Sequence, residues 1–241
     1  MPDRLPRPRP KALPRGPRGE RRDPLTRERV VAAAVALADE IGVAPLTVRK
    51  LAASLGVGPM ALYHHVASKD EILGAMIDAV FAEIELPPDK AEWRAGMALR
   101  ARSARAVFAR HPWVAAMMDS RTEPGPATLA HHEAVLRCLR GGLSVRMAAH
   151  AYALLDAFVC GFALQEAALP FGDETESAAV AAAILDGIPD DACPHLAEMA
   201  REHVLQPGYD IGAEFEFGLE LVLDGLAAAA GREDVPRPRR A

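Results

Sequence analysis

Aromatic residues and cysteines are scarce in this sequence. Aromatic side chains make up 5% of the 241 residues, and the three cysteines, Cys138, Cys160 and Cys193, lie far apart. An odd number of widely spaced cysteines favours reduced thiols over a disulfide framework or a cysteine metal site. Segments with the alternating polar and apolar pattern of strands are also scarce, so the sequence predicts an all-α fold.

Signatures of catalysis are absent as well. The sequence has no phosphate-binding glycine loop, no G-x-S-x-G elbow and no H-E-x-x-H metal motif. The neighbours His64 and His65 do not suit one metal ion, because adjacent helical side chains diverge by about 100°, and the same holds for His131 and His132. Cys160 could pair with a distant histidine, but a cysteine in a buried apolar helix is usually unreactive. We therefore expect no enzyme, no cofactor and no metal.

No segment combines the length and the apolar character of a membrane helix or a secretory signal. The basic N-terminus has no apolar run. The most apolar stretch, residues 147–169, is interrupted by His150, Asp156, Gln165 and Glu166. This favours a buried helix over a membrane span, and we expect a cytoplasmic protein with no membrane partner.

Charge is distributed unevenly along the chain. The net charge is −5, which by itself argues against a nucleic-acid partner. Residues 1–70, however, hold 13 Lys and Arg against 7 Asp and Glu, whereas residues 71–241 hold 15 against 26. A basic first part and an acidic body indicate that one end of the protein meets an anionic partner.

The composition divides the chain into four parts. Residues 1–24 are rich in Pro and Arg and read as a disordered basic arm, either a solvated tail or an arm that follows DNA. Residues 25–86 form a first helical domain, which ends at the Pro87-Pro88 break. Residues 87–231 form a larger helical domain, and residues 232–241 form a charged tail.

Residues 46–70, LTVRKLAASLGVGPMALYHHVASKD, have the pattern of a helix-turn-helix. Gly56 suits the left-handed end of one helix, Pro59 suits the start of the next, and Leu62 and Val66 would face the core. Three hydroxyl residues can cap first turns: Thr26, Thr47 and Ser68. Helices are predicted at 26–41, 47–55, 59–66, 68–84, 89–110, 111–119, 126–140, 144–168, 174–186, 191–205 and 211–230.

The segments LTVRKLAASLGV, ALYHHV and SKDEIL resemble the DNA-binding domain of the tetracycline-repressor (TetR) family of transcriptional regulators in order, spacing and residue type. The rest resembles the tetracycline-repressor-like regulatory domain more weakly, through Leu86-Pro87, Trp93-Arg94, His111-Pro112 and Gly142-Leu143-Ser144. The resemblance implies an N-terminal three-helix helix-turn-helix domain that binds DNA. It also implies a larger C-terminal helical domain for ligand binding and dimerisation.

Ten residues are predicted to contact DNA: Thr47, Val48, Arg49, Pro59, Met60, Ala61, Tyr63, His64, His65 and Lys69. The outer face of a short recognition helix reaches the major groove, where Met60 can meet a thymine methyl group. Arg49 can grip guanine O6 and N7. By resemblance, Tyr63 and His65 are the main contacts and Lys69 binds phosphate, although Tyr63 could instead be half-buried core.

One position departs from the family pattern. Gly58 precedes the recognition helix, where family members often carry Ser or Thr. Without a hydroxyl group, one capping hydrogen bond and one possible phosphate contact are missing.

Two apolar helices suggest a dimer, the usual solution for a single helix-turn-helix that reads a short half-site. Residues 147–169 carry two charges, and the last helix has a wide apolar stripe. The stripe consists of Ile211, Phe215, Phe217, Leu219, Leu221, Val222, Leu223 and Leu226. These helices suit a four-helix interface between two copies, and burial within one subunit is the alternative.

Large and adaptable side chains among many alanines suggest a pocket in the second domain, although such residues are more often ordinary core. The resemblance implies a small apolar ligand there. The predicted contacts are Val107, Arg110, His111, Trp113, Met117, Phe158, Phe162 and Gln165, with His111 and Gln165 as polar partners.

The expected function is that of a homodimeric repressor which a small molecule releases from its double-stranded operator DNA. The ligand would shift the helix at 68–84 and so change the separation of the two recognition helices. The alternatives are a helical interaction adaptor and an activator that lacks a small-molecule ligand.

Overall fold

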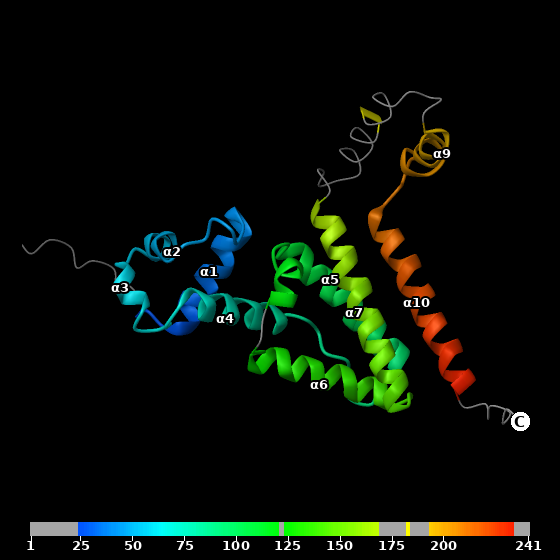
Figure 1. Cartoon of the computed structure of the whole chain (residues 1–241), viewed down its shortest axis with the longest axis horizontal. Helices are drawn as coiled ribbons and strands as arrows, with labels where there is room; N and C mark the ends of the chain where they lie inside the picture. Colours follow the sequence, from blue (N-terminus) through cyan, green and yellow to red (C-terminus); the bar gives the residue numbers. More distant parts are fainter. Residues whose placement is uncertain (1–23, 121–122, 169–181, 184–192, 234–241) are drawn as a thin grey trace, which may run out of the picture.

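The computed structural model describes residues 24–120, 123–168, 182–183 and 193–233. These residues are helical, with no strand among them, which confirms the all-α fold class. Figure 1 shows helices α1 to α4 at one end and the long helices α5, α7 and α10 at the other. Of the helix expected at 174–186, the structure describes residues 182–183, which are helical, and the rest lies outside the described residues, as do residues 1–23 of the arm and the tail beyond 233.

Three of the first four helices begin at the hydroxyl residues predicted to cap them. Thr26, Thr47 and Ser68 each accept a hydrogen bond from the backbone N–H three residues on, at 3.2, 3.2 and 3.0 Å. Gly56 ends α2 with φ 67°, in the left-handed region that glycine adopts without a steric penalty. The helices are α1 (Arg27–Ile41), α2 (Val48–Leu55), α3 (Pro59–Leu62) and α4 (Lys69–Phe81).

The recognition helix is shorter than its predicted span of 59–66. Its α-helical part ends at Leu62, and residues 63–65 form a tight turn. The N–H groups of His65 and Val66 both bond to the Leu62 carbonyl, at 2.9 and 3.0 Å, which tightens the last turn. The helix predicted to reach residue 84 likewise ends at Phe81, and turn bonds carry the chain on to Ile84.

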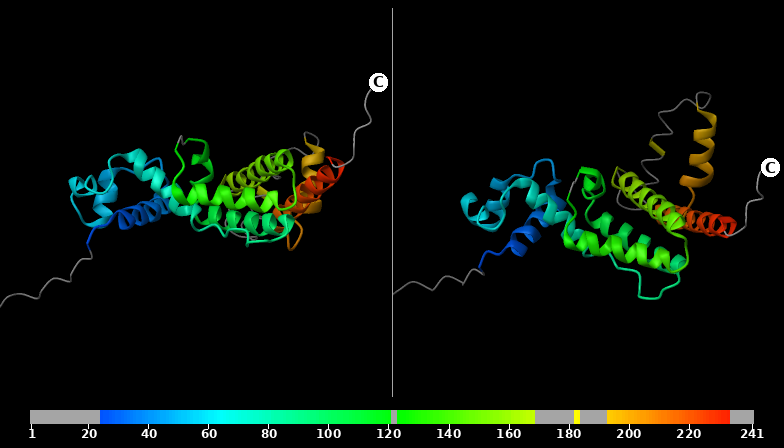
Figure 2. Two further views of the ribbon diagram at one scale, coloured as in Figure 1. Left: turned by 90° about the horizontal axis from the view of Figure 1, so that it is seen from below. Right: turned by 60° about the horizontal axis from the view of Figure 1, so that its bottom comes forward.

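The second domain is a bundle in which α7 packs on α5, α6 and α10 (Figures 1 and 2). The segment predicted as a helix at 111–119 forms a short 3-10 helix instead, and the one at 191–205 divides into an α-helix and a π-helical turn. The elements are α5 (Trp93–Arg110), η1 (Ala115–Ser120), α6 (Pro126–Arg140), α7 (Val145–Ala168), α9 (Pro194–Met199), η2 (Ala200–Val204) and α10 (Ile211–Glu233).

Helix α4 belongs to the cores of both domains. Its buried residues Ile72 and Met76 lie in the same hydrophobic cluster as the first three helices. One end of the helix carries Phe81, whose ring packs 6.5 Å from Phe108 on α5 and 5.3 Å from His131 on α6. The hydrophobic core therefore runs without a break from the DNA-binding helices into the bundle.

Helix α7 is long and apolar enough to cross a membrane by length and composition. In this fold it is a bundle helix, because it packs against three other helices and its two acidic residues are paired. Asp156 lies 2.6 Å from the buried Arg100, and Glu166 lies 2.6 Å from Arg105. Within one chain, Leu154 and Leu164 of α7 remain 47% and 43% exposed.

Candidate DNA-binding surface and regulatory core

The recognition segment has one buried face and one open face. Leu62 and Val66 are 0% and 3% exposed, so they anchor the segment to the core as their spacing predicts. Met60 and Tyr63, by contrast, are 74% and 48% exposed. Large apolar side chains on an open surface are typical of a binding face.

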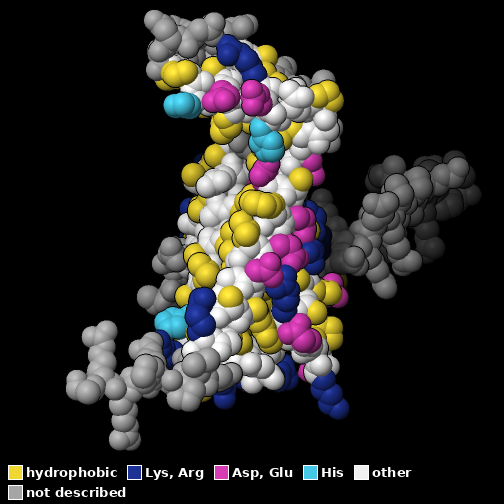
Figure 3. Space-filling model, turned by 90° about the vertical axis from the view of Figure 1, so that its right-hand side faces the viewer, with side chains coloured by type: hydrophobic (Ala, Val, Ile, Leu, Met, Phe, Trp, Pro, Cys, Tyr) yellow, Lys and Arg dark blue, Asp and Glu magenta, His cyan; other side chains and the backbone are white. Residues whose placement is uncertain are grey.

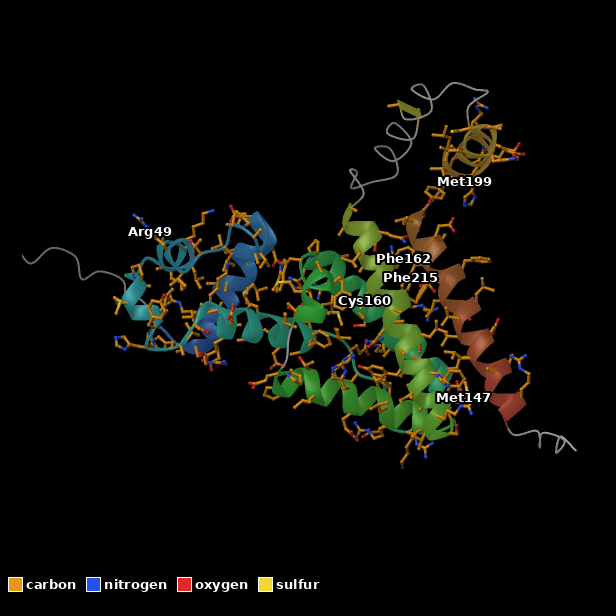
Figure 4. All side chains as sticks on the ribbon, in the orientation of Figure 1. Arg49, Met147, Cys160, Phe162, Met199 and Phe215 are labelled. Atoms are coloured by element: carbon orange, nitrogen blue, oxygen red, sulfur yellow. The ribbon has the colours of Figure 1, made fainter. Side chains whose placement is uncertain are left out.

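The ten predicted DNA contacts lie together around α2, α3 and the start of α4. Val48, Ala61 and His65 are half-buried, and the others are exposed. Figure 4 shows Arg49 on α2 directed away from the body of the protein. Helices α2 and α3, which carry most of these residues, lie at the end of the molecule that is far from α7 and α10 (Figure 1).

The backbone at this end supplies donors for phosphate. The first turns of α2 and α4 carry helix N-terminal N–H groups, and the side chains of Thr47 and Ser68 already bond to one such group each. Glu71 accepts from the N–H of Ala67 at 2.6 Å, which lowers the pKa of that carboxyl below its usual value, and it also pairs with Arg27. Ser68 thus caps α4 as predicted, whereas the Glu71 carboxylate binds the N–H of Ala67, one residue before the cap residue.

Gly58 is the cap residue of α3 and makes no side-chain capping bond. Its φ of −75° is ordinary for any residue, and a Cβ at this position would meet nothing within 4 Å. Neither the backbone nor packing therefore requires glycine at this position, and a larger residue such as serine fits here.

Two carboxylates of the DNA-binding domain bind the C-terminal end of α5 and the residues that follow it. Asp39 on α1 lies 2.8 Å from His111 Nδ1 and accepts from Trp113 Nε1 at 2.7 Å. Glu83, just after α4, lies 2.6 Å from the Arg110 guanidinium, and this contact together with His111 holds the pKa of Glu83 below its usual value. Arg110, His111 and Trp113, all predicted ligand contacts, are thus engaged in joining the two domains.

The other predicted ligand contacts lie in separate places. Val107 is buried on α5, and Gln165 is exposed near the end of α7. Phe158 and Phe162 form an aromatic cluster with Phe215 of α10, at centroid distances of 5.2 and 5.1 Å. Figure 4 shows Phe162 and Phe215 close together. The structure therefore brings the two phenylalanines of α7 together with Phe215.

An open groove of about 1120 Å³ lies where the two domains meet. It runs between α1, α4 and residues 123–127, and its lining includes Arg27, Asp78 and Met117. Met117 is the predicted ligand contact that borders this groove. The lining includes residues of α4, so a molecule bound in the groove would contact the helix that connects the two domains.

A buried polar cluster lies at the centre of the second domain, and the sequence did not predict it as a site. Arg100 on α5 is 3% exposed, and its Nε donates to Nε2 of the fully buried His131 at 3.2 Å. His132 bonds to the hydroxyl group of Tyr152, and Asp156 neutralises Arg100. Nδ1 of His131, which carries the proton in this arrangement, has no partner within the part of the chain that the structure describes.

The cluster had partial signals in the sequence. Asp156 interrupts an apolar helix, and His131 and His132 form an unusual pair. What the sequence does not show is that helices α5, α6 and α7 bring these residues together. Buried ionisable groups with shifted pKa values often mark functional sites, although structural ion pairs shift pKa values too.

A helix-turn-helix with an open recognition face, continuous through α4 with a separate helical domain, defines a DNA-binding transcriptional regulator. Comparison with known proteins gives the same class. Residues 30–76 match the model of bacterial regulatory proteins of the tetR family, and residues 86–230 match that of tetracyclin repressor-like C-terminal domains.

Individual relatives cover most of the chain. The HTH-type transcriptional repressor DrrR1 of Streptomyces coeruleorubidus is 35% identical over 212 residues, which span 84% of this chain and 77% of the relative. The class A tetracycline repressor protein from transposon 1721 of Escherichia coli is 33% identical over 202 residues, 82% of this chain and 88% of that protein. ActR from Streptomyces coelicolor, in complex with actinorhodin, superposes with a TM-score of 0.69 at 33% identity, covering 86% of this chain and 99% of ActR.

The chain therefore belongs to the tetracycline-repressor (TetR) family. Its function is that of a ligand-responsive, DNA-binding transcriptional repressor.

The buried His131 predicts a loss of stability in acid. Burial first, and then the Arg100 charge, lower its pKa from 6.5 to about 3. The folded protein keeps this imidazole neutral, whereas the unfolded chain takes up a proton below about pH 6.5, so falling pH favours unfolding. The contribution is about 2 kcal/mol at pH 5.

The His131→Gln variant isolates this contribution, because glutamine keeps an acceptor for Arg100 and does not titrate. Denaturant unfolding at pH 7 and pH 5 should show the larger loss in the wild type, by about 2 kcal/mol. Equal losses in both proteins would show that His131 does not remain neutral in the folded state.

Proposed function

We propose that the chain binds operator DNA as a homodimer through the ten residues around α2, α3 and the start of α4. The observation that carries this proposal is the open face of α3 beside Arg49, above the buried Leu62 and Val66. Arg49 suits a bidentate contact to guanine, and Lys69 suits a phosphate at the N-terminus of α4. The protein acts in the cytoplasm as a regulator and not as an enzyme.

Two substitutions separate base recognition from phosphate binding. Arg49→Ala should cost about 1–3 kcal/mol of operator binding and relax the preference at one base pair. Lys69→Ala should weaken binding to all sequences about equally and lower the salt slope by about 1. Fluorescence anisotropy with operator duplexes selected from random sequence measures both. Wild-type binding by both variants would remove these two residues from the contact set.

Gly58→Ser tests the missing cap. A serine hydroxyl at this position can bond to the first turn of α3 and reach a phosphate, and the space around Gly58 is open. We expect a few tenths of a kcal/mol of added stability and tighter operator binding. Gly58→Ala, which adds a side chain without a hydroxyl group, is the matched control. If the two variants bind operator alike, the hydroxyl group makes no phosphate contact.

The dimer is proposed to form through α7 and α10. Figure 3 shows the side of the molecule on which α10 lies, with hydrophobic side chains along it and charged side chains at one edge. Phe217 and Leu221 are 67% and 56% exposed there. Beside them, Arg102 pairs with Glu216 at 2.6 Å and fixes α10 on α5. An exposed apolar stripe on a firmly held helix suits a contact between two copies.

Phe217→Glu should therefore produce monomers at concentrations where the wild type is dimeric, because two buried carboxylates would face the interface. Analytical ultracentrifugation measures the change, and the variant should also lose stable operator binding. Leu129→Glu, at a position 54% exposed on α6, is the control that should stay dimeric. A dimeric Phe217→Glu variant would place the interface elsewhere.

The ligand is proposed to be a small, largely apolar molecule bound by the second domain. Support comes from the aromatic pair Phe158 and Phe162, from Met117 at the groove, and from ActR, whose structure holds actinorhodin. The remaining proposed contacts are Val107, Arg110, His111, Trp113 and Gln165. A ligand that prefers one arrangement of these residues would shift the junction at Asp39 and Glu83, and with it α4.

Actinorhodin and minocycline are concrete first probes, because both are bound by proteins of similar structure. A ligand-responsive repressor should release operator DNA with at least one such aromatic compound. Operator affinity that no member of a broad aromatic library alters would favour a regulator without a small-molecule ligand. A helical adaptor, the remaining alternative, would show no salt-dependent gel shift with the DNA upstream of its own gene.

A further inference from the structure

Helix α6 begins without a cap of its own. Its cap residue is Gly125, which has no side chain, and its first residue is Pro126. The N–H groups of Ala127 and Thr128 are the ones that a capping side chain would normally bind. In this structure they are bound by a residue from another helix.

The substitute cap is Asp78 of α4. Its Oδ1 accepts from the Thr128 N–H at 2.8 Å and from the Thr128 hydroxyl at 3.0 Å, and its Oδ2 accepts from the Ala127 N–H at 3.3 Å. A carboxylate at a helix N-terminus is also favoured by the helix dipole. The first turn of α6 is therefore held by a side chain that moves with α4.

The contact with Asp78 explains why residue 125 is a glycine. Its φ is −78°, so its backbone does not require glycine. A Cβ at this position, however, would lie 2.3 Å from Cγ and 2.4 Å from Oδ1 of Asp78. The space that a cap side chain would fill is thus occupied by the carboxylate of α4, and the two residues fit each other.

Helix α4 connects this contact to the DNA-binding end. It starts at Lys69, directly after the recognition turn, and Asp78 lies nine residues further, about 14 Å along the helix. The start of α6 also lies close in the chain to η1, the short helix that contains Met117. Any shift at the start of α6 must either carry α4 with it or break the hydrogen bonds to Asp78.

We propose that Asp78 is a positioning residue that couples operator binding to the regulatory domain by tying the first turn of α6 to α4. This inference rests on the proposed operator binding. Coupling between two sites is reciprocal, so DNA bound at α3 and Lys69 must stabilise the first turn of α6 through Asp78. The proposal can therefore be tested with DNA alone, before a ligand is identified.

The test is hydrogen exchange of the full-length protein, with and without a saturating operator duplex selected from random sequence. In the wild type, operator should slow exchange in the peptide spanning residues 125–130 by about fivefold or more. In Asp78→Ala this slowing should disappear, although the variant still binds the duplex. Asp78→Asn, which keeps one acceptor oxygen, should retain part of it. Asp89→Asn, an exposed acid-to-amide change, is the control that should behave as wild type.

Gly125→Ala provides an independent route to the same state. The added methyl group occupies the position of the Asp78 carboxylate, so this variant should also lose the operator-dependent slowing. In the Asp78→Ala background the clash is gone, and Gly125→Ala should change exchange in this peptide by no more than about twofold. Additive effects of the two substitutions would contradict direct contact as the cause.

The possible outcomes distinguish a failure of the proposed operator binding from a failure of the proposed coupling through Asp78. A wild-type protein that binds no selected duplex would overturn the proposed operator binding. A wild-type protein that binds DNA without slowing exchange at 125–130 would overturn the coupling alone. Equal slowing in the wild type and in Asp78→Ala would reduce Asp78 to a local cap, while loss of slowing in both Asp78→Ala and Gly125→Ala supports the proposal.

Discussion

The fold depends on the burial of α4 between α1 and α6. This helix of 13 residues begins at the recognition turn and ends against the ring of Phe108 and the imidazole of His131. Because close-packed cores do not deform continuously, a helix shared by two cores must move as a rigid body or not at all. The orientation of the DNA-binding face is therefore set by how α4 sits on the second domain.

Polar contacts fix the position of α4 on the second domain. Asp39, Asp78 and Glu83, all from the DNA-binding end, accept hydrogen bonds or ion pairs from the second domain. Hydrophobic contact alone has little directional preference, whereas a carboxylate that binds two or three donors fixes both position and angle. A ligand that changes the donors would change the angle of α4, which is the simplest physical route from a regulatory domain to DNA.

The sequence predicts those parts of the structure that depend on local physics. The caps at Thr47 and Ser68 and the inward spacing of Leu62 and Val66 involve neighbours within four residues, so they are readable from the chain. The contact of Arg100 with His131 and that of Asp78 with Thr128 join residues 31 and 50 positions apart. They depend on how helices cross, which no local pattern specifies. For the same reason, the contacts of Arg110, His111 and Trp113 with Asp39 and Glu83 could not be predicted from the sequence, because they join residues of different helices that are far apart in the chain.

The most direct measurement is the affinity of the full-length protein for its selected operator and for a scrambled duplex of equal length, across a series of salt concentrations. We predict that the protein binds the operator at least about 10³-fold more tightly at physiological salt, with a steep decline in both affinities as salt rises. Equal affinity for the two duplexes at every salt concentration would contradict sequence-specific recognition by the α2 and α3 surface.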